Sequence, residues 1–329
     1  MELPHITDVA ARQVIDSTKA YKEYVRVRKE LGALGNSVRW KKVEGYEYLV
    51  QRTGRKLEYL GKRSPETEQT HEEHAKKRER LAARFKALSE VVETSQRMNK
   101  AVRAGSVPPE LIELLLKLDE LGLAERSVLL GAPALYAYGQ TSGLRVEAIK
   151  TPSKKESIVV EATRCIHLLI EDPDVYASSS FRRLTEAVKR VASVEHATLK
   201  RGKGTALDIV FHLSKDPLTD KPSRKAPLVP NLNAERPAEP WLDVIKTAPK
   251  YEQVVIGKTG KMAVMRTVDP MLFSIVFKCT SPRSEGSPKD EELAASQVEL
   301  VETMLREHMV NSKIDPSQRA HLAMQVSAD

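Results

Sequence analysis

The sequence predicts an α+β protein, and three observations support this fold class. Apolar residues recur at helical spacing in two long N-terminal segments, residues 5–35 and 64–104. Short stretches of strand length follow, at residues 127–130, 166–170, 206–213, 251–256 and 263–268. Helical patterning returns near the end of the chain, at residues 270–278 and 290–308. This order indicates a sheet in the middle of the chain with helices before, between and after its strands.

The first of these segments predicts a helix followed by a small β-hairpin unit. The helical run ends at Gly32 and Gly35, residues typical of helix C-termini. Strand-like patterning then covers residues 38–50 and 57–60, with a turn at residues 53–55. A second helix is expected to begin at Ser64-Pro65, because serine caps helices and proline suits their first position.

The hairpin unit is rich in basic and aromatic residues. Its basic residues are Arg39, Lys41, Lys42, Arg52, Arg55, Lys56, Lys62 and Arg63, and its larger aromatic residues are Trp40, Tyr46, Tyr48 and Tyr59. Such a mixture suits contact with phosphates and stacking on bases, so nucleic acid is a candidate partner. The alternative is structural, with the aromatic rings packed against the long helix and the basic groups solvated.

Composition bounds the class of protein. The chain has 53 Lys and Arg against 45 Asp and Glu, a net charge of +8, which favours anionic partners. Its two cysteines, Cys165 and Cys279, form no disulfide framework. The N-terminus has no apolar signal sequence and no apolar run is long enough to cross a bilayer, so we expect a cytoplasmic protein without a membrane partner.

We expect four segments along the chain. Residues 1–105 hold the first helix, the basic hairpin and the long charged helix, and residues 106–213 hold an α/β core. Residues 214–240 are proline-rich and polar and are expected to form a loop. Residues 241–329 hold a second hairpin and the C-terminal helices.

Four longer blocks carry a resemblance to known proteins. They are VRWKKVEGYEYLV at 38–50, LGKRSPETE at 60–68, LGAPALYAY at 130–138, and APKYEQVVI at 248–256 with Asp269-Pro270 after it. With these blocks the chain resembles a bacterial family of nucleotidyltransferase-fold proteins, related in fold to DNA polymerase beta and to the minimal nucleotidyltransferases. The resemblance implies a mixed sheet flanked by helices, with a nucleotide held over its edge and the N-terminal helix, hairpin and long helix as an extension.

The resemblance also implies a site. The turn at Gly131 and Ala132 would contact the triphosphate of a nucleotide, and two aspartates one residue apart on the next strand would bind Mg²⁺. Alternate residues of a strand lie on one face, so such a pair presents two hard oxygen ligands together. Two metal ions held there would support transfer of a nucleoside monophosphate with loss of pyrophosphate.

Two further residues match positions of the family. Asp208 corresponds to a third metal-binding aspartate on a neighbouring strand, and Lys278 lies where the family tends to carry a basic residue. Each also has a structural interpretation. Asp208 can bond the backbone at a strand end, and Lys278 can favour the negative end of its helix.

The aspartate pair itself is missing. Where the family reads Ala-Thr-x-Asp-hydrophobic-Asp-Leu-Leu, this chain has ATRCIHLL, with Cys165 and His167 at the aspartate positions. A thiol and an imidazole are poor Mg²⁺ ligands and suit Zn²⁺ better, but two such ligands leave a site incomplete. The alternative is a buried structural cysteine and a hydrogen-bonded histidine. Asp172 and Asp174, with a proline between them, are candidates for displaced carboxylates.

Two function classes follow. The first is a nucleotidyltransferase that uses Mg²⁺, an NTP and an acceptor that the sequence does not identify. The second is a pseudoenzyme in which loss of the aspartate pair has left a module that binds nucleotide, nucleic acid or protein. The missing pair favours the second class, and the sequence predicts neither an acceptor nor an oligomeric state.

Overall fold

A computed structural model describes most of the chain. The described residues are 3–34, 38–53, 56–150, 157–159, 165–170, 179, 183–184, 198–201, 205–213, 240–280, 288–307 and 310–327. The chain divides into two compact units: Arg12–Ala101 forms one, and Met1–Ala11 with Val102–Asp329 forms the other. Of the proline-rich segment expected at 214–240, all but Pro240 lies outside the described residues.

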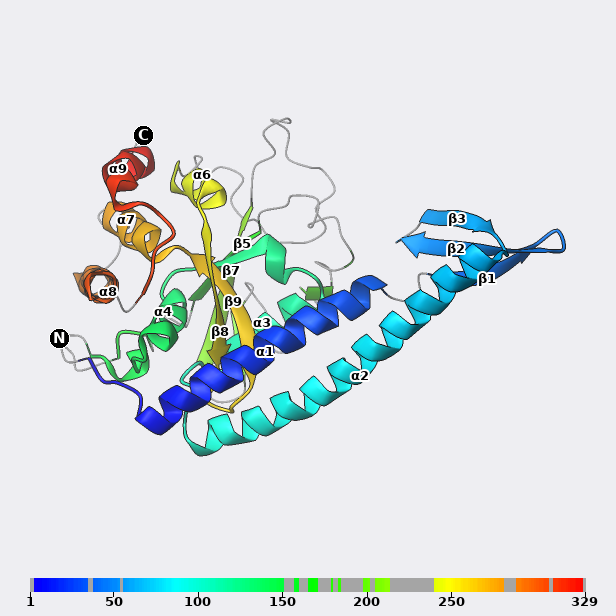
Figure 1. Cartoon of the computed structure of the whole chain (residues 1–329). Helices are drawn as coiled ribbons and strands as arrows, with labels where there is room; N and C mark the ends of the chain where they lie inside the picture. The colour runs from blue at the N-terminus through cyan, green and yellow to red at the C-terminus, as the bar shows by residue number, and fades with distance from the viewer. Residues whose placement is uncertain are drawn as a thin grey trace. The chain divides into compact units, whose positions relative to one another are not determined.

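The unit Arg12–Ala101 holds most of helix α1 (Asp8–Leu34), a small sheet and the long helix α2 (Pro65–Ala101), all drawn in Figure 1. The predicted start of α2 is confirmed. The backbone N–H of Thr67 donates to the Ser64 hydroxyl (3.4 Å), and the N–H of Ser64 donates to the Thr67 hydroxyl (2.8 Å). These reciprocal bonds satisfy N–H groups that a helix start leaves without partners.

The small sheet is antiparallel and has three strands in the order β1 (Val38–Val43), β2 (Tyr46–Thr53), β3 (Lys56–Lys62). Glu44 and Gly45 make the β1–β2 turn with positive φ angles of 49° and 85°. Two successive residues in this region give the turn whose twist matches that of the strands it joins. The predicted basic hairpin unit is therefore a three-stranded meander, which we call the basic sheet.

The second unit contains a six-stranded sheet in the order β6-β7-β5-β4-β9-β8. Its strands are β4 (Ser127–Leu130), β5 (Cys165–Ile170), β6 (Thr198–Arg201), β7 (Thr205–Leu213), β8 (Lys250–Ile256) and β9 (Met262–Val268). β4 is antiparallel to β5 but parallel to β9, and β5 is parallel to β7. The outer pairs, β6–β7 and β8–β9, are antiparallel. The mixed sheet expected for this fold class is confirmed.

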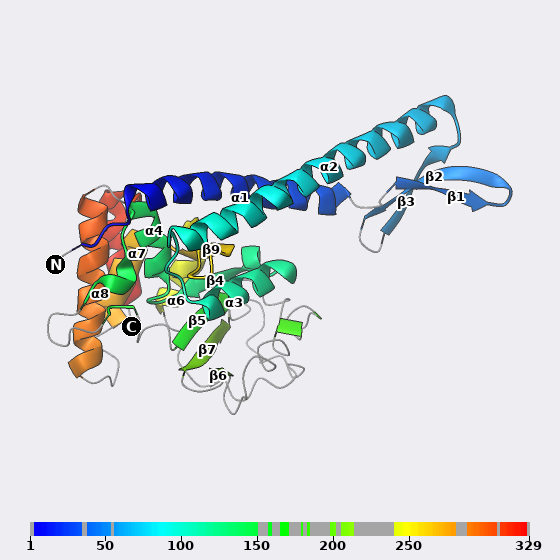
Figure 2. The same ribbon diagram turned by 90° about the horizontal axis from the view of Figure 1, so that it is seen from below.

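Helices precede, separate and follow these strands. They are α3 (Pro109–Glu120), α4 (Ala134–Ser142), α6 (Pro240–Thr247), α7 (Pro270–Thr280), α8 (Pro288–Arg306) and α9 (Arg319–Ser327), with short 3₁₀ turns at Ala124–Arg126, Val146–Ala148 and Pro316–Gln318. α7 packs against α8 and α9, while α4 packs against α8 and β8. Figure 2 shows α4, α7 and α8 gathered at one side of this sheet.

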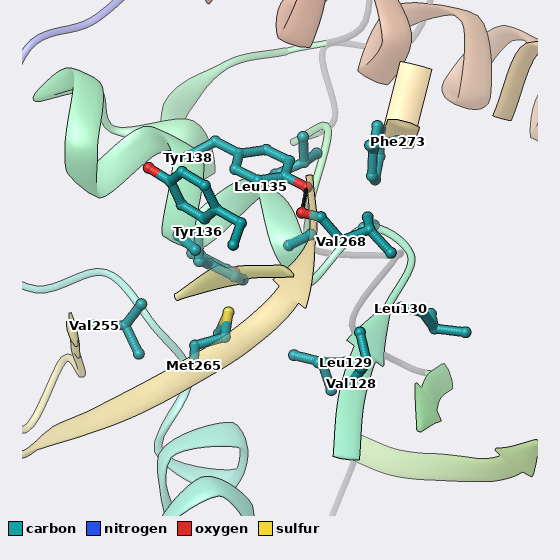
Figure 3. Close-up of a cluster of buried hydrophobic side chains, with 14 of the residues drawn as sticks. Val128, Leu129, Leu130, Leu135, Tyr136, Tyr138, Val255, Met265, Val268 and Phe273 are labelled. Carbon is teal, nitrogen blue, oxygen red and sulfur yellow. Dashed lines mark hydrogen bonds between the residues drawn. The ribbon is translucent and has the colours of Figure 1, made fainter. Parts of the chain in front are cut away.

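The core of this unit is organised around Tyr138 of α4 (Figure 3). Its ring is fully buried and meets the rings of Tyr251 and Phe273 edge-on, at centroid distances of 5.3 and 5.8 Å. Its hydroxyl donates to the backbone oxygen of Val268 (2.8 Å). A buried tyrosine requires such a partner, so this bond ties α4 to the end of β9.

The residue after β9, Asp269, joins three parts of the unit. Its buried carboxylate accepts hydrogen bonds from the backbone N–H of Met271 (2.9 Å) at the start of α7. It also accepts from the Ser312 hydroxyl (2.6 Å) and from the backbone N–H of Lys313 (2.7 Å). One side chain therefore caps α7 and fixes the segment between α8 and α9.

We expect Asp269→Ala to lower the free energy of unfolding by about 4 kcal/mol, because three hydrogen-bond donors, one of them fully buried, lose a charged acceptor. Asp315→Ala is the matched control, since the exposed Asp315 carboxylate caps only a 3₁₀ turn through the N–H of Ser317. Urea unfolding followed by circular dichroism measures both variants. Equal losses of stability in the two variants would contradict the role given to Asp269.

Buried tyrosines make stability depend on pH in the alkaline range. Burial raises the pKa of Tyr138 well above its ordinary value, and the nearby Asp269 raises it further. Burial also raises the pKa of Tyr136 and of Tyr251. In the unfolded chain a tyrosine ionises near pH 10. Below that pH both states keep the proton. Above it only the unfolded chain releases the proton, so the folded state loses stability as the pH rises.

We expect the free energy of unfolding to fall steeply above about pH 10. Tyr138→Phe should be less stable by about 1 kcal/mol at neutral pH, because the bond to Val268 is lost, yet show a shallower alkaline fall. Tyr46→Phe, at an exposed tyrosine, is the control and should keep the original slope. The measurement is urea unfolding at a series of pH values. An unchanged slope in Tyr138→Phe would show that another group controls the alkaline transition.

Candidate functional site

The predicted strand–turn–helix at Gly131 is confirmed. β4 ends at Leu130, Gly131 has a positive φ of 80°, and α4 begins at Ala134. Glycine adopts this φ without the steric penalty that other residues meet. The N–H groups of Ala134 and Leu135 already donate to the carbonyls of Gly131 and Ala132, both at 3.0 Å. A phosphate bound at this turn would therefore meet the amides of Gly131 and Ala132, ahead of Pro133.

The sheet register brings the candidate metal positions next to this turn. Leu130, the last residue of β4, is paired with His167 of β5, and Cys165 of β5 is paired with Asp208 of β7. Paired residues on neighbouring strands, and alternate residues along one strand, share a face of the sheet. Cys165, His167 and Asp208 are thus at one edge and on one face, beside the point where the chain leaves β4 for Gly131.

Of the remaining candidate residues, only Lys278 lies in the part of the chain that the structure describes. Lys278 belongs to α7, which starts at Pro270. Asp172 and Asp174 lie outside the described residues, so the hypothesis of displaced carboxylates stays a prediction. For Cys165, His167, Asp208 and Lys278 the structure describes the backbone and not the side chain.

Among the side chains that the structure describes, which do not include those of Cys165, His167 and Asp208, no group of three or more His, Cys, Asp or Glu residues could hold a metal ion. A metal site elsewhere in the described part of the chain therefore receives no support.

A pocket that the sequence did not predict opens near β8 and β9. It has a volume of about 720 Å³ and is lined by the side chains of Lys246, Lys250, Glu252, Arg266 and Lys313, together with Ala248-Pro249. Four of these side chains are basic and one is acidic. The residues come from α6, from both strands and from the segment before α9, so no local pattern in the sequence marks them.

The basic sheet presents cations against aromatic rings. Lys62 Nζ lies 4.3 Å from the centroid of the Tyr46 ring, and Lys41 Nζ lies 5.5 Å from that of Tyr59. Tyr46 and Tyr59 are 60% and 49% exposed. Trp40 differs, because its ring lies 5.7 Å from that of His71 in α2. The structural interpretation therefore holds for Trp40, whereas the two tyrosines remain at the surface.

Comparison with known families adds one finding. A family model described as Nucleotidyltransferase matches residues 110–320. The chain belongs to this nucleotidyltransferase family. Among curated proteins and among solved structures, neither comparison finds a match. The family match begins in α3 and ends in α9, so it contains the whole six-stranded sheet, while the unit Arg12–Ala101 precedes it.

No helix in the described part of the chain combines the length and the apolar character needed to cross a membrane.

Proposed function

We propose that this nucleotidyltransferase-family protein binds a nucleoside triphosphate at the Gly131 turn and transfers nucleoside monophosphate very weakly or not at all. The observation that carries the proposal is the pairing of Asp208 with Cys165, the position at which the sequence resemblance implies an aspartate. Membership of the family supports a nucleotide as the ligand. The residues that match the family model include the Gly131 turn and strands β4, β5 and β7, which carry the candidate site.

The donor set at this edge does not fit a pair of Mg²⁺ ions. Mg²⁺ prefers an octahedron of oxygen ligands, and one carboxylate with a thiol and an imidazole does not supply it. Without a carboxylate pair, two ions cannot be held against both the attacking and the leaving oxygen. The proposed function accordingly contains no metal-assisted step.

Binding of a nucleotide requires fewer functional groups than catalysis of its reaction. Backbone amides at a turn that precedes a helix can bind phosphate oxygens without any ionisable side chain. In the proposed complex the amides of Gly131 and Ala132 bind the triphosphate, and Lys278 is the candidate cation that neutralises its charge. Asp208 is kept in the proposed site as the acidic residue paired with Cys165 in the sheet register.

We expect the full chain to bind a non-hydrolysable NTP analogue saturably in calorimetry, while labelled NTP with Mg²⁺ or Mn²⁺ releases no pyrophosphate above background. The double variant Cys165→Asp/His167→Asp restores the carboxylate pair, and its pyrophosphate release, with water accepting the nucleoside monophosphate, should rise to at least about 100-fold above background. Adding Asp208→Asn to that variant should abolish the gain, because the third ligand is then lost.

Two results would overturn this proposal. Robust pyrophosphate release by the unmodified chain that disappears in Asp208→Asn would show that catalysis survives. Absence of saturable binding of any of the four common NTPs would remove the nucleotide as ligand.

A second candidate function is nucleic-acid binding by the basic sheet. The observation that favours it is the exposure of Tyr46 and Tyr59 with Lys62 and Lys41 beside their rings. Exposed rings stack on bases whatever the sequence of the strand, and nearby cations neutralise its phosphates. This function concerns the unit Arg12–Ala101, which lies before the residues that match the family.

If the basic sheet binds single-stranded nucleic acid, affinity should fall steeply with salt, since phosphate neutralisation releases counterions. Lys41→Gln/Lys62→Gln should weaken binding and reduce the slope of log K against log salt by about 1.4. Lys77→Gln/Lys86→Gln removes the same charge from α2 and is the control. Fluorescence anisotropy with a labelled oligonucleotide measures both. If neither salt nor either pair of substitutions changes the affinity, the basic sheet has a structural role only.

A further inference from the structure

The register of the basic sheet sorts its side chains into two faces, because paired residues on neighbouring strands point to the same side. One of these faces, which we call the tyrosine face, carries Arg39, Lys41, Tyr46, Tyr48, Tyr59 and Lys62. Tyr59 and Lys62 are three residues apart in β3 and share this face because the pairing of β2 with β3 shifts between Leu49 and Val50. A bulge of this kind re-aims side chains. All three strands therefore contribute to one surface.

The opposite face of the basic sheet packs against α2. The ring of Trp40 lies 5.7 Å from that of His71 in α2, and Leu49, which is paired with Trp40, is fully buried. Glu47 and Glu58 are the acidic residues of the three strands, and the register puts both of them on this face. The tyrosine face therefore carries no carboxylate from the strands.

Rings and cations form one row across the tyrosine face. Lys62 Nζ lies 4.3 Å from the centroid of the Tyr46 ring and 6.0 Å from that of Tyr48. The ring of Tyr48 meets that of Tyr59 edge-on, with 5.8 Å between the centroids. Lys41 Nζ lies 5.5 Å from the centroid of Tyr59 and donates to its hydroxyl (3.0 Å). The row therefore reaches from Tyr46 in β2, through β3, to Lys41 in β1.

This row offers two kinds of contact that a single strand of nucleic acid can use. Aromatic rings stack on bases, and ammonium groups neutralise phosphates. The rings that Lys41 and Lys62 contact are uncharged, so these contacts hold the lysines in place without cancelling their charge. Tyr46 and Tyr59 are 60% and 49% exposed, which leaves ring surface for a base.

A duplex matches the row less well than a single strand does. Its phosphates can meet the lysines, but its bases are stacked on one another, and a base must leave that stack at a cost before a ring can receive it. An anionic membrane would also use the lysines and would gain nothing from stacking. The rings therefore favour a ligand with unpaired bases.

We propose that the tyrosine face binds unpaired bases, so that its ligand is a single strand of nucleic acid in preference to a duplex. The inference deepens the second candidate function and rests on it, since it assigns the face of the sheet and the class of nucleic acid. Tyr46 and Tyr59 stack on bases, while Lys41 and Lys62 contact phosphates. The opposite face makes no contact with the ligand.

Two neighbouring lysines test the choice of face. Lys41 and Lys42 are both exposed in β1 and lie on opposite faces. In fluorescence anisotropy with the full chain and labelled oligo-dT, Lys41→Gln should reduce the slope of log K against log salt by about 0.7, the value for one phosphate contact with a single strand. Lys42→Gln removes the same charge and should leave the slope unchanged. Equal changes in the two variants would overturn the assignment of the face.

Stacking is tested at the exposed rings. Tyr46→Leu keeps an apolar side chain but removes the ring, so it should weaken binding of oligo-dT at least about fivefold and change binding of a duplex of the same length less than about twofold. Tyr46→Phe keeps the ring and should restore the original affinity. Tyr59→Leu makes the same prediction at a second ring if Tyr46→Leu does not fold, which circular dichroism checks. Equal weakening for single strand and duplex would contradict stacking.

The outcomes separate this inference from the function on which it rests. If neither nucleic acid binds, both fail. If the duplex competes as well as the single strand and Tyr46→Leu changes neither affinity, nucleic-acid binding stands and the inference fails. Vesicles of phosphatidylserine and phosphatidylcholine are the third probe. Binding of vesicles without binding of oligo-dT would assign the lysines to a membrane surface and overturn the inference.

Discussion

The buried carboxylate of Asp269 is the interaction on which most of the second unit depends. It lies at the end of β9, caps α7 and fixes the segment before α9 through Ser312 and Lys313. Tyr138 reinforces the same junction from α4 by its bond to Val268. A buried carboxylate is stable only when hydrogen bonds compensate its lost hydration, and here the compensating donors come from separate elements. The same bonds that satisfy the charge therefore join the end of β9 to the C-terminal helices.

The candidate site follows from strand order and register. Because β4 lies between β5 and β9, residues distant in the chain meet on one face: His167 beside the end of β4, Asp208 beyond it, and Arg266 on the other side. Cys165 and His167, at the positions where the resemblance implies an aspartate pair, belong to β5, whereas the Gly131 turn follows β4. The nucleotide binding that we propose at this turn therefore does not depend on the β5 residues at the expected metal positions.

Local patterns in the sequence predicted much of this fold. The Ser64 cap, the turn at Gly131 and the strands of the β8–β9 hairpin were all recognisable, because each depends on neighbouring residues. The parallel pairing of β4 with β9 and the pocket were not. Lys313 reaches Lys250 only through bonds made by the folded chain, and such long-range contacts leave no period in the sequence. The identity of the metal positions came from family resemblance, and their chemistry stays a prediction.

The central claim is that the protein binds a nucleotide although Cys165 and His167 replace the expected pair of metal-binding aspartates. A crystal structure with a non-hydrolysable NTP analogue and Mn²⁺ tests this claim most directly. Anomalous scattering locates Mn²⁺ independently of the interpretation of the protein density. The account predicts a triphosphate on the amides of Gly131 and Ala132, with no pair of Mn²⁺ peaks at Cys165 and His167. Two Mn²⁺ ions bridging the phosphates and Asp208 would contradict it and would establish a working metal centre.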